Sequence, residues 1–204
     1  TPRRPEQPAR ASHHDVDRDK IETGVRLILE GIGEDPERPG LQKTPERVAD
    51  MYADIFAGIG AADPAEVLTA IPGDHHREMV LIRDIAFYSV CEHHLLPFHG
   101  LAHVAYIPSE HGHIAGLSKL ARVVKLVAAR PQLQERITSE VADAIQTALD
   151  PTGALVLIEA EHLCMSMRGV RTPGSKTVTS AVRGLIRTNE ATRAEVFALI
   201  NAPR

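Results

Sequence analysis

Apolar residues in the first third of the chain recur at the spacing of a helix. A stripe within residues 15–31 repeats every three or four positions and predicts a helix that Gly31 and Gly33 end. A second stripe within residues 44–56 predicts another helix, with Thr44 as its N-cap and Pro45 at its first position. Neither predicted helix carries a recognisable chemical motif.

The hydrophobic period changes after residue 77. Residues 78–91 are rich in β-branched and aromatic side chains and predict one or two strands, and further strands are predicted over 99–107, 154–162 and 176–184. Helices are predicted to begin at Ser118 and at Pro131, a last helix covers about 190–201, and residues 109–116 predict a hairpin-like loop. This order favours an α+β fold, in which an antiparallel sheet carries helices on one face.

The pattern divides the chain into three parts. Residues 1–14 have no periodicity and predict a disordered tail, residues 15–76 form an N-terminal helical region, and residues 77–204 contain the sheet. Charge follows a similar division, because residues 1–84 hold 11 basic and 17 acidic side chains, whereas residues 85–204 hold 12 and 10. An anionic ligand is therefore expected in the second part.

Composition narrows the class of protein. The 204 residues are 43% hydrophobic but only 3% aromatic, so aliphatic side chains must fill the core. The chain has no apolar run long enough to cross a membrane and no apolar segment near its start, which predicts neither a membrane span nor a secretory signal. A net charge of −4 argues against nucleic-acid binding. Two cysteines beside eleven histidines suggest reduced thiols in the cytoplasm and a search for a metal site.

Cys91 and His94 form a Cys-x-x-His pair just after a predicted strand, and Cys164 is the other cysteine of the chain. These three ligands would leave the fourth position of a tetrahedral zinc open, as in a catalytic site. A structural zinc would need a fourth ligand, which His93 or His162 could supply. Two buried free cysteines with surface histidines are about as plausible on spacing alone.

The segment His162-Leu163-Cys164 favours the metal site. Residues two apart in a strand point to the same face, so His162 and Cys164 are expected to project together, and Arg168 also if the strand continues. A purely structural strand has no reason to place an imidazole, a thiolate and a guanidinium on one face. His93 and His162 would then be free for acid–base work, since imidazole titrates near neutrality.

A second group of residues predicts an anion site. Lys119 and Arg122 share a face at the start of a predicted helix, where the backbone dipole already favours anions. A solvated basic helix start is the more common meaning of this motif alone. Glu135, in the first turn of the next helix, fits the dipole and could also accept two N–H donors from a purine edge.

Long motifs in this second part closely resemble the GTP cyclohydrolase I family. They are FYSVCEHHLLPFHG, HVAYIP, GLSKLAR, RPQLQERIT, EAEHLCMSMRGV and GSKTVTSAVRG, and the likeness is continuous from about Glu78 to Ile200. The helix TPERVADMY shows it more weakly. The resemblance implies a tunnelling fold, which has a four-stranded antiparallel sheet with two helices on one face, preceded by N-terminal helices. It also implies a toroidal homodecamer with active sites between subunits.

The resemblance further implies an activity and a role for each matching residue. The family converts GTP and water to 7,8-dihydroneopterin triphosphate and formate, the first step of tetrahydrofolate or pterin biosynthesis. Cys91, His94 and Cys164 match the ligands of one zinc ion per subunit. His93, His162 and Ser118 match catalytic residues. Other residues match positions around the substrate. Glu135 matches the residue that binds guanine, and Glu92 matches one that lines the same pocket. The residues that match positions around ribose and triphosphate are Gln134, Lys119, Arg122, Arg168 and Arg47.

Three other classes of protein would share part of this pattern. Another tunnelling-fold enzyme would keep the purine-anchoring Glu135 but lack the zinc ligands. A zinc nucleobase deaminase needs a Cys-x-x-Cys pair, which this chain lacks. A binding module with a structural zinc would bind GTP without releasing formate, and other borderline divalent ions would also suit thiolate and imidazole ligands.

Overall fold

A computed structural model describes residues 16–72, 76–110 and 113–203, and the predicted tail over residues 1–14 lies outside them. The chain divides into two compact units, the first ending at Ala62 and the second beginning at Asp63. The sequence instead places the division between residues 76 and 77. Residues 63–72 belong to the second unit because Leu68 is buried in its main core.

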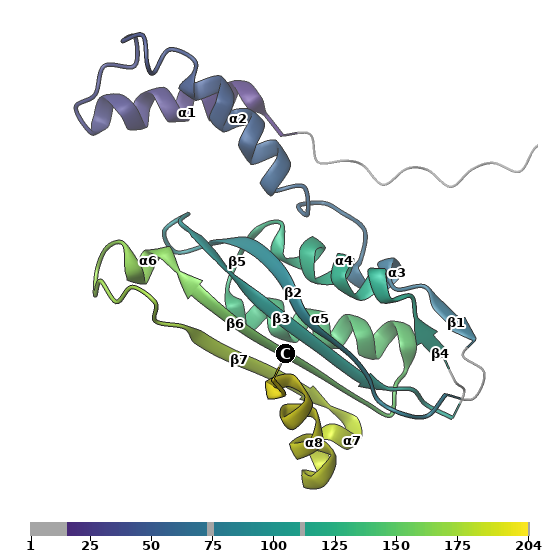
Figure 1. The fold of residues 1–204 in the computed structure, drawn as a ribbon. Coiled ribbons are helices and arrows are strands. Elements are labelled where there is room, and N and C mark those ends of the chain that lie inside the picture. Colours follow the sequence, from purple (N-terminus) through teal and green to yellow (C-terminus); the bar gives the residue numbers. More distant parts are fainter. Residues whose placement is uncertain (1–15, 73–75, 111–112, 204) are drawn as a thin grey trace, which may run out of the picture. The chain divides into compact units, whose positions relative to one another are not determined.

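The N-terminal unit contains a pair of helices, α1 (Arg18–Gly31) and α2 (Thr44–Ile55), which pack against each other (Figure 1). The Asp17 side chain caps α1 by accepting from the backbone N–H of Lys20. The predicted cap of α2 is wrong, because Lys43 occupies the N-cap position and Thr44 is already helical. A preceding turn, closed by the Thr44 N–H on the Leu41 carbonyl, supplies the helix start without a side-chain cap.

The second unit is built on one sheet in the order β5-β2-β3-β6-β7. Its strands are β2 (Val80–Cys91), β3 (Pro97–Ile107), β5 (Pro131–Gln132), β6 (Gly153–His162) and β7 (Thr177–Arg183). β2, β3, β6 and β7 pair antiparallel as predicted, whereas the short β5 runs parallel to β2. The chain therefore forms an α+β fold around a four-stranded antiparallel sheet, extended by one short strand.

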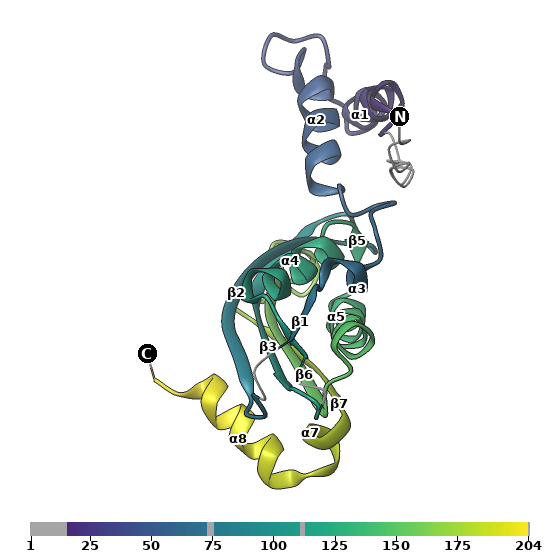
Figure 2. The ribbon, with the colours of Figure 1, turned by 90° about the vertical axis from the view of Figure 1, so that its right-hand side faces the viewer.

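Helices α4 (Leu117–Ala128) and α5 (Gln134–Leu149) cover one face of the curved sheet (Figure 2). The prediction that Pro131 begins a helix is wrong, since Pro131 and Gln132 pair with the end of β2 and α5 begins at Gln134. This pairing matters for function, because it draws the first turn of α5 toward the last residues of β2.

The core is aliphatic, as the composition predicts. Inward-facing residues of β2, β3 and β6 pack against the buried stripes of α4 and α5, with Tyr106 and Phe98 among the large buried side chains. A smaller cluster lies on the other face, under α7 (Gly184–Thr188) and α8 (Glu190–Asn201). Arg83 ties α8 to β2 by donating to the carbonyls of Leu199 and Ala202.

Three further short elements of this unit also escaped the sequence pattern. They are α3 (Pro64–Val67), and the strands β1 (Ala70–Pro72) and β4 (His113–Ala115), which pair with each other. Part of the predicted loop over 109–116 is thus a strand, while residues 111–112 lie outside the described part. No helix among the described residues is long and apolar enough to span a membrane.

Candidate functional site

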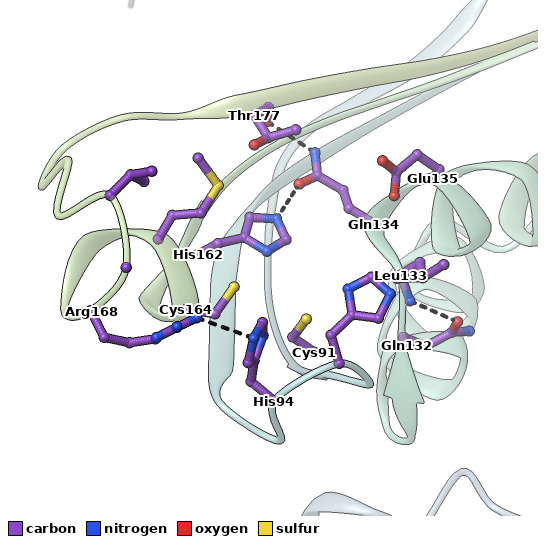
Figure 3. Close-up of a pocket in the computed structure, with 14 residues that line it drawn as sticks. Cys91, His94, Gln132, Leu133, Gln134, Glu135, His162, Cys164, Arg168 and Thr177 are labelled. Atoms are coloured by element: carbon purple, nitrogen blue, oxygen red, sulfur yellow. Dashed lines mark hydrogen bonds between the residues drawn. The ribbon is translucent and has the colours of Figure 1, made fainter.

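A cavity of about 410 Å³ opens at one end of the sheet, where β2 ends at Cys91 and β6 ends at His162 (Figure 3). The β5–α5 junction forms another wall. The residues that line it are Cys91, His93, His94, Gln132, Leu133, Gln134, Glu135, His162, Cys164, Met165, Arg168, Gly169, Val170 and Thr177. Segments far apart in the sequence therefore meet here through strand pairing.

Cys91, His94 and Cys164 form a cluster that could hold a metal ion. One potential ligand atom from each lies within 4.8 Å of the others, as the sequence predicted. Cys91 is buried at the end of β2, and a tight turn closed by the Leu95 N–H on the Cys91 carbonyl brings His94 close to it. Burial, and then the neighbouring Cys91, raise the pKa of the Cys164 thiol. A bound cation would oppose this rise, because metals bind the thiolate form of cysteine.

Cys164 reaches this cluster by a route that the sequence did not predict. The strand does not continue past His162, and residues Leu163–Ser166 form the short helix α6. The alternation argument for His162 and Cys164 is therefore wrong, although both side chains line the cavity. Arg168 follows α6, and its Nη1 lies 3.1 Å from Nε2 of His94.

His162 is held on two sides. Its ring stacks on Phe98, with ring centres 4.5 Å apart and an angle of 4° between the planes, because the two residues are partners in the β3–β6 register. Its Nε2 lies 2.7 Å from Oε1 of Gln134. Burial lowers the pKa of His162, and the negative charge of Glu135 partly opposes this effect.

Three other residues predicted for the site lie in the cavity or next to it. Glu135 lies in the first turn of α5 and faces the cavity (Figure 3). His93 is exposed, with its ring centre 6.3 Å from that of His94. The Glu92 carboxylate accepts two hydrogen bonds from Arg136, at 2.6 and 3.1 Å, and this pairing lowers its pKa. Glu92 therefore enters an ion pair next to the cavity.

Sequence reasoning missed several contributors to the site. Phe98 supports the His162 ring, but its position follows only from the β3–β6 register. Gln132 is completely buried, and its side chain bonds to the carbonyl of Val127 and to Glu140. Its place inside the quoted motif RPQLQERIT was the available signal. Thr177 lines the cavity from β7, where no side-chain pattern distinguished it.

The structure does not bring every predicted residue to this cavity. Ser118, Lys119 and Arg122 lie at the N-terminal end of α4 and are not among the residues that line it. The C-terminal end of α4 is the end that lies near the cavity. There the Ser89 hydroxyl of β2 donates to the Ala128 carbonyl at 2.8 Å, two residues before β2 ends at Cys91. A helix of 12 residues is about 18 Å long, which separates the three side chains from the cavity within one chain. Arg47 lies on α2, in the N-terminal unit.

Comparison with known proteins gives a consistent result over most of the chain. Residues 21–201 match the GTP cyclohydrolase I family. The chain is 63% identical over 185 residues to the GTP cyclohydrolase 1 of Carboxydothermus hydrogenoformans, covering 91% of this chain and 95% of the relative. The GTP cyclohydrolase 1 of Bacillus subtilis is 60% identical over 183 residues, covering 90% and 95% of the two chains. This chain therefore belongs to the GTP cyclohydrolase I family of enzymes.

Proposed function

We propose that this enzyme hydrolyses GTP to 7,8-dihydroneopterin triphosphate and formate, and that it does so in the cavity at the end of β2 and β6. The observation that carries the proposal is the meeting of three potential metal ligands, a half-buried histidine and a carboxylate in one cavity. Family membership sets the reaction, and the cavity supplies groups suited to it.

The donor set of the cluster fits zinc. Two thiolates and one imidazole are common zinc ligands, and three protein ligands leave a coordination position for water or substrate. Cys91, His94 and Cys164 would hold the ion, which when bound would supply Lewis acidity for hydrolytic attack on the purine. Two thiolates donate more charge than imidazoles would, so proton transfer by neighbouring side chains becomes more important.

His162 is the best-placed residue for proton transfer to the purine. Carbon C8 of guanine is a poor electrophile, and protonation of an adjacent ring nitrogen makes it a better one. The stacked Phe98 and the bond to Gln134 fix the His162 ring beside the metal-binding cluster. His93 is more exposed and could serve later proton transfers, after the imidazole ring of the purine has opened.

Glu135 would select guanine. Its carboxylate faces the cavity and can accept two N–H groups from the pyrimidine edge of the base, whereas adenine presents no equivalent pair. The Arg168 guanidinium lies across the metal-binding cluster from Glu135 (Figure 3) and can contact phosphate. These groups position the substrate rather than take part in bond breaking.

Ser118, Lys119 and Arg122 would act on GTP bound to a neighbouring subunit. Within one chain the length of α4 keeps them from the cavity, so a shared site requires a second copy. Several exposed apolar side chains beside the cavity, namely Leu95, Met167 and Val170, offer a surface for such a copy. This arrangement agrees with the homodecamer and the interfacial sites that the resemblance implies, and it leaves a phosphate-binding role for Arg47.

The proposal is tested by incubating the zinc-loaded protein with GTP. Formate should appear together with a pterin that becomes fluorescent after oxidation, in equal amounts. ATP under the same conditions should give neither product. Binding of GTP without formate would instead assign the protein to the class of non-catalytic zinc modules.

A further inference from the structure

The side chain of Gln134 is buried next to the ring of His162. It is only 1% exposed, and its Oε1 lies 2.7 Å from His162 Nε2. Its Nε2 lies 3.1 Å from the carbonyl oxygen of Ile158 and 2.9 Å from that of Thr177. The amide is therefore fixed between two strands on one side and the histidine on the other (Figure 3).

These contacts determine which way round the amide lies. The carbonyl oxygens of Ile158 and Thr177 can only accept hydrogen bonds, so the NH₂ group of Gln134 must face them. The amide oxygen then faces His162, and it too can only accept. Nε2 of His162 must therefore carry the proton of this hydrogen bond.

The hydrogen bonds of two threonine hydroxyls agree with this orientation of the Gln134 amide. Thr138 donates to the backbone carbonyl of Gln134 at 2.7 Å, which commits its single proton. The 2.7 Å contact between Thr138 and Thr179 must then use the proton of Thr179. The Thr179 oxygen remains as an acceptor for the Gln134 amide at 3.2 Å, where it shares one of the two N–H groups with a strand carbonyl. Each hydroxyl proton is thus assigned without conflict.

We propose that Gln134 is a positioning residue, which holds His162 as the Nε2–H tautomer and leaves Nδ1 as the ring atom that exchanges protons with the substrate. Nδ1 points away from Gln134, toward the space beside Cys91, His94 and Cys164 (Figure 3). The kinetic consequence rests on the proposed function, whereas the tautomer itself does not. A substrate contact by the Gln134 side chain, which the resemblance implies, would require the amide to leave these partners.

The tautomer is measured by nitrogen magnetic resonance on zinc-loaded protein labelled with [¹⁵N]histidine. A protonated and an unprotonated ring nitrogen give well-separated signals, and the His162 signals are those missing from a His162→Ala sample. We expect Nε2 to be the protonated nitrogen in the neutral ring. A neutral ring protonated at Nδ1, or an equal mixture of the two forms, would overturn the proposal.

Gln134→Met tests the role of the amide, because methionine has a similar shape but cannot accept the proton. We expect mixed tautomers and a kcat about 10- to 100-fold lower, with KM and zinc content within about twofold of wild type. If Gln134→Met does not fold, Gln134→Glu is the second variant: its protonated carboxyl can donate to one strand carbonyl and accept from His162, so the Nε2–H signal should be kept. Gln146→Met is the control, since Gln146 lies on the same helix α5 but does not line the cavity, and its His162 signals should match wild type.

The outcomes separate this proposal from the proposed function. A raised KM with unchanged kcat in Gln134→Met would show a substrate contact and overturn the positioning role, as would an unchanged tautomer with full activity. If the wild-type protein shows the Nε2–H tautomer but releases no formate from GTP, the proposed function fails while the tautomer assignment stands.

Discussion

Two regions of the second unit carry most of the residues expected to act on GTP, and they differ in how close the fold brings them to the cavity. At the end of β2 and β6, strand pairing brings Cys91 and Cys164 together although 72 residues lie between them in the sequence. At the start of α4, Ser118, Lys119 and Arg122 are adjacent to one another but remain about a helix length from the cavity. In the proposed function, the metal-binding cluster and His162 therefore come from one chain, whereas Ser118, Lys119 and Arg122 would come from a second.

This difference predicts which subunit of an oligomer a mutation should impair. Changes in the cavity should impair the subunit that carries them. Changes at the start of α4 should impair the cavity of a neighbour, which activity measurements on mixed oligomers can distinguish.

Cys164→Ser should have the largest effect, because a neutral hydroxyl replaces one of three proposed metal ligands. We expect loss of bound zinc and at least about a thousandfold loss of formate release. Metal content by mass spectrometry and product assay on the same sample provide the measurement. Ser166→Ala, on the same short helix α6, should keep its zinc. Full activity of Cys164→Ser without bound metal would remove zinc from the mechanism.

His162→Ala should be the next most damaging change. Loss of a proton-transfer group typically costs a hundred- to ten-thousand-fold in rate, and we expect about a thousandfold here. Zinc content and GTP affinity should stay close to wild type, since His162 is not a member of the metal-binding cluster. His99→Ala, on an exposed part of β3, serves as the control. Wild-type turnover in a correctly folded His162→Ala protein would refute the proposed role of His162.

The basic pair on α4 provides the sharpest test of the comparison. Lys119→Ala combined with Arg122→Ala should raise the KM for GTP about 10- to 100-fold, whereas Lys125→Ala near the other end of α4 should change it little. Co-expression of this double variant with His162→Ala subunits should then restore about a quarter of the activity, if each site uses two copies. Mixed oligomers no more active than their parents would place the whole site in one chain.

The sequence predicted the elements better than their ends. Periodicity located the four antiparallel strands and the two covering helices, because each buries one regular face. It failed at Pro131 and at Leu163, where pairing with β2 and the end of the sheet override local preference. Both places lie beside the cavity, so the two wrong predictions concern β5 and α6, which direct residues at the site.

Site residues were predictable where the reactive side chains lie close together in the sequence. Cys91 and His94 are three residues apart, and the turn that joins β2 to β3 keeps them together. The roles of Phe98 and Gln134 were not predictable, since one depends on the β3–β6 register and the other on backbone carbonyls of two strands. A side chain that supports a reactive group through backbone contacts leaves no pattern of its own in the sequence.

Glu135→Gln should weaken GTP binding about as much as loss of the basic pair on α4, and it bears on guanine selection. The amide of glutamine is neutral and offers one acceptor oxygen, so it can take only part of the two N–H bonds from the guanine edge. Loss of a hydrogen bond to a charged group costs about 1.5–3 kcal/mol, which corresponds to roughly 10- to 100-fold weaker binding. Equilibrium titration with GTP measures this loss, and Glu195→Gln on α8 is a control of the same charge change.

Zinc content should be unchanged in Glu135→Gln, because the carboxylate is not part of the Cys91, His94 and Cys164 cluster. The preference for GTP over ATP should narrow by the same factor as the affinity for GTP falls, since the carboxylate is the group expected to distinguish the two bases. Undiminished preference for GTP would show that backbone groups around the cavity select the base, and that Glu135 mainly contributes charge beside His162.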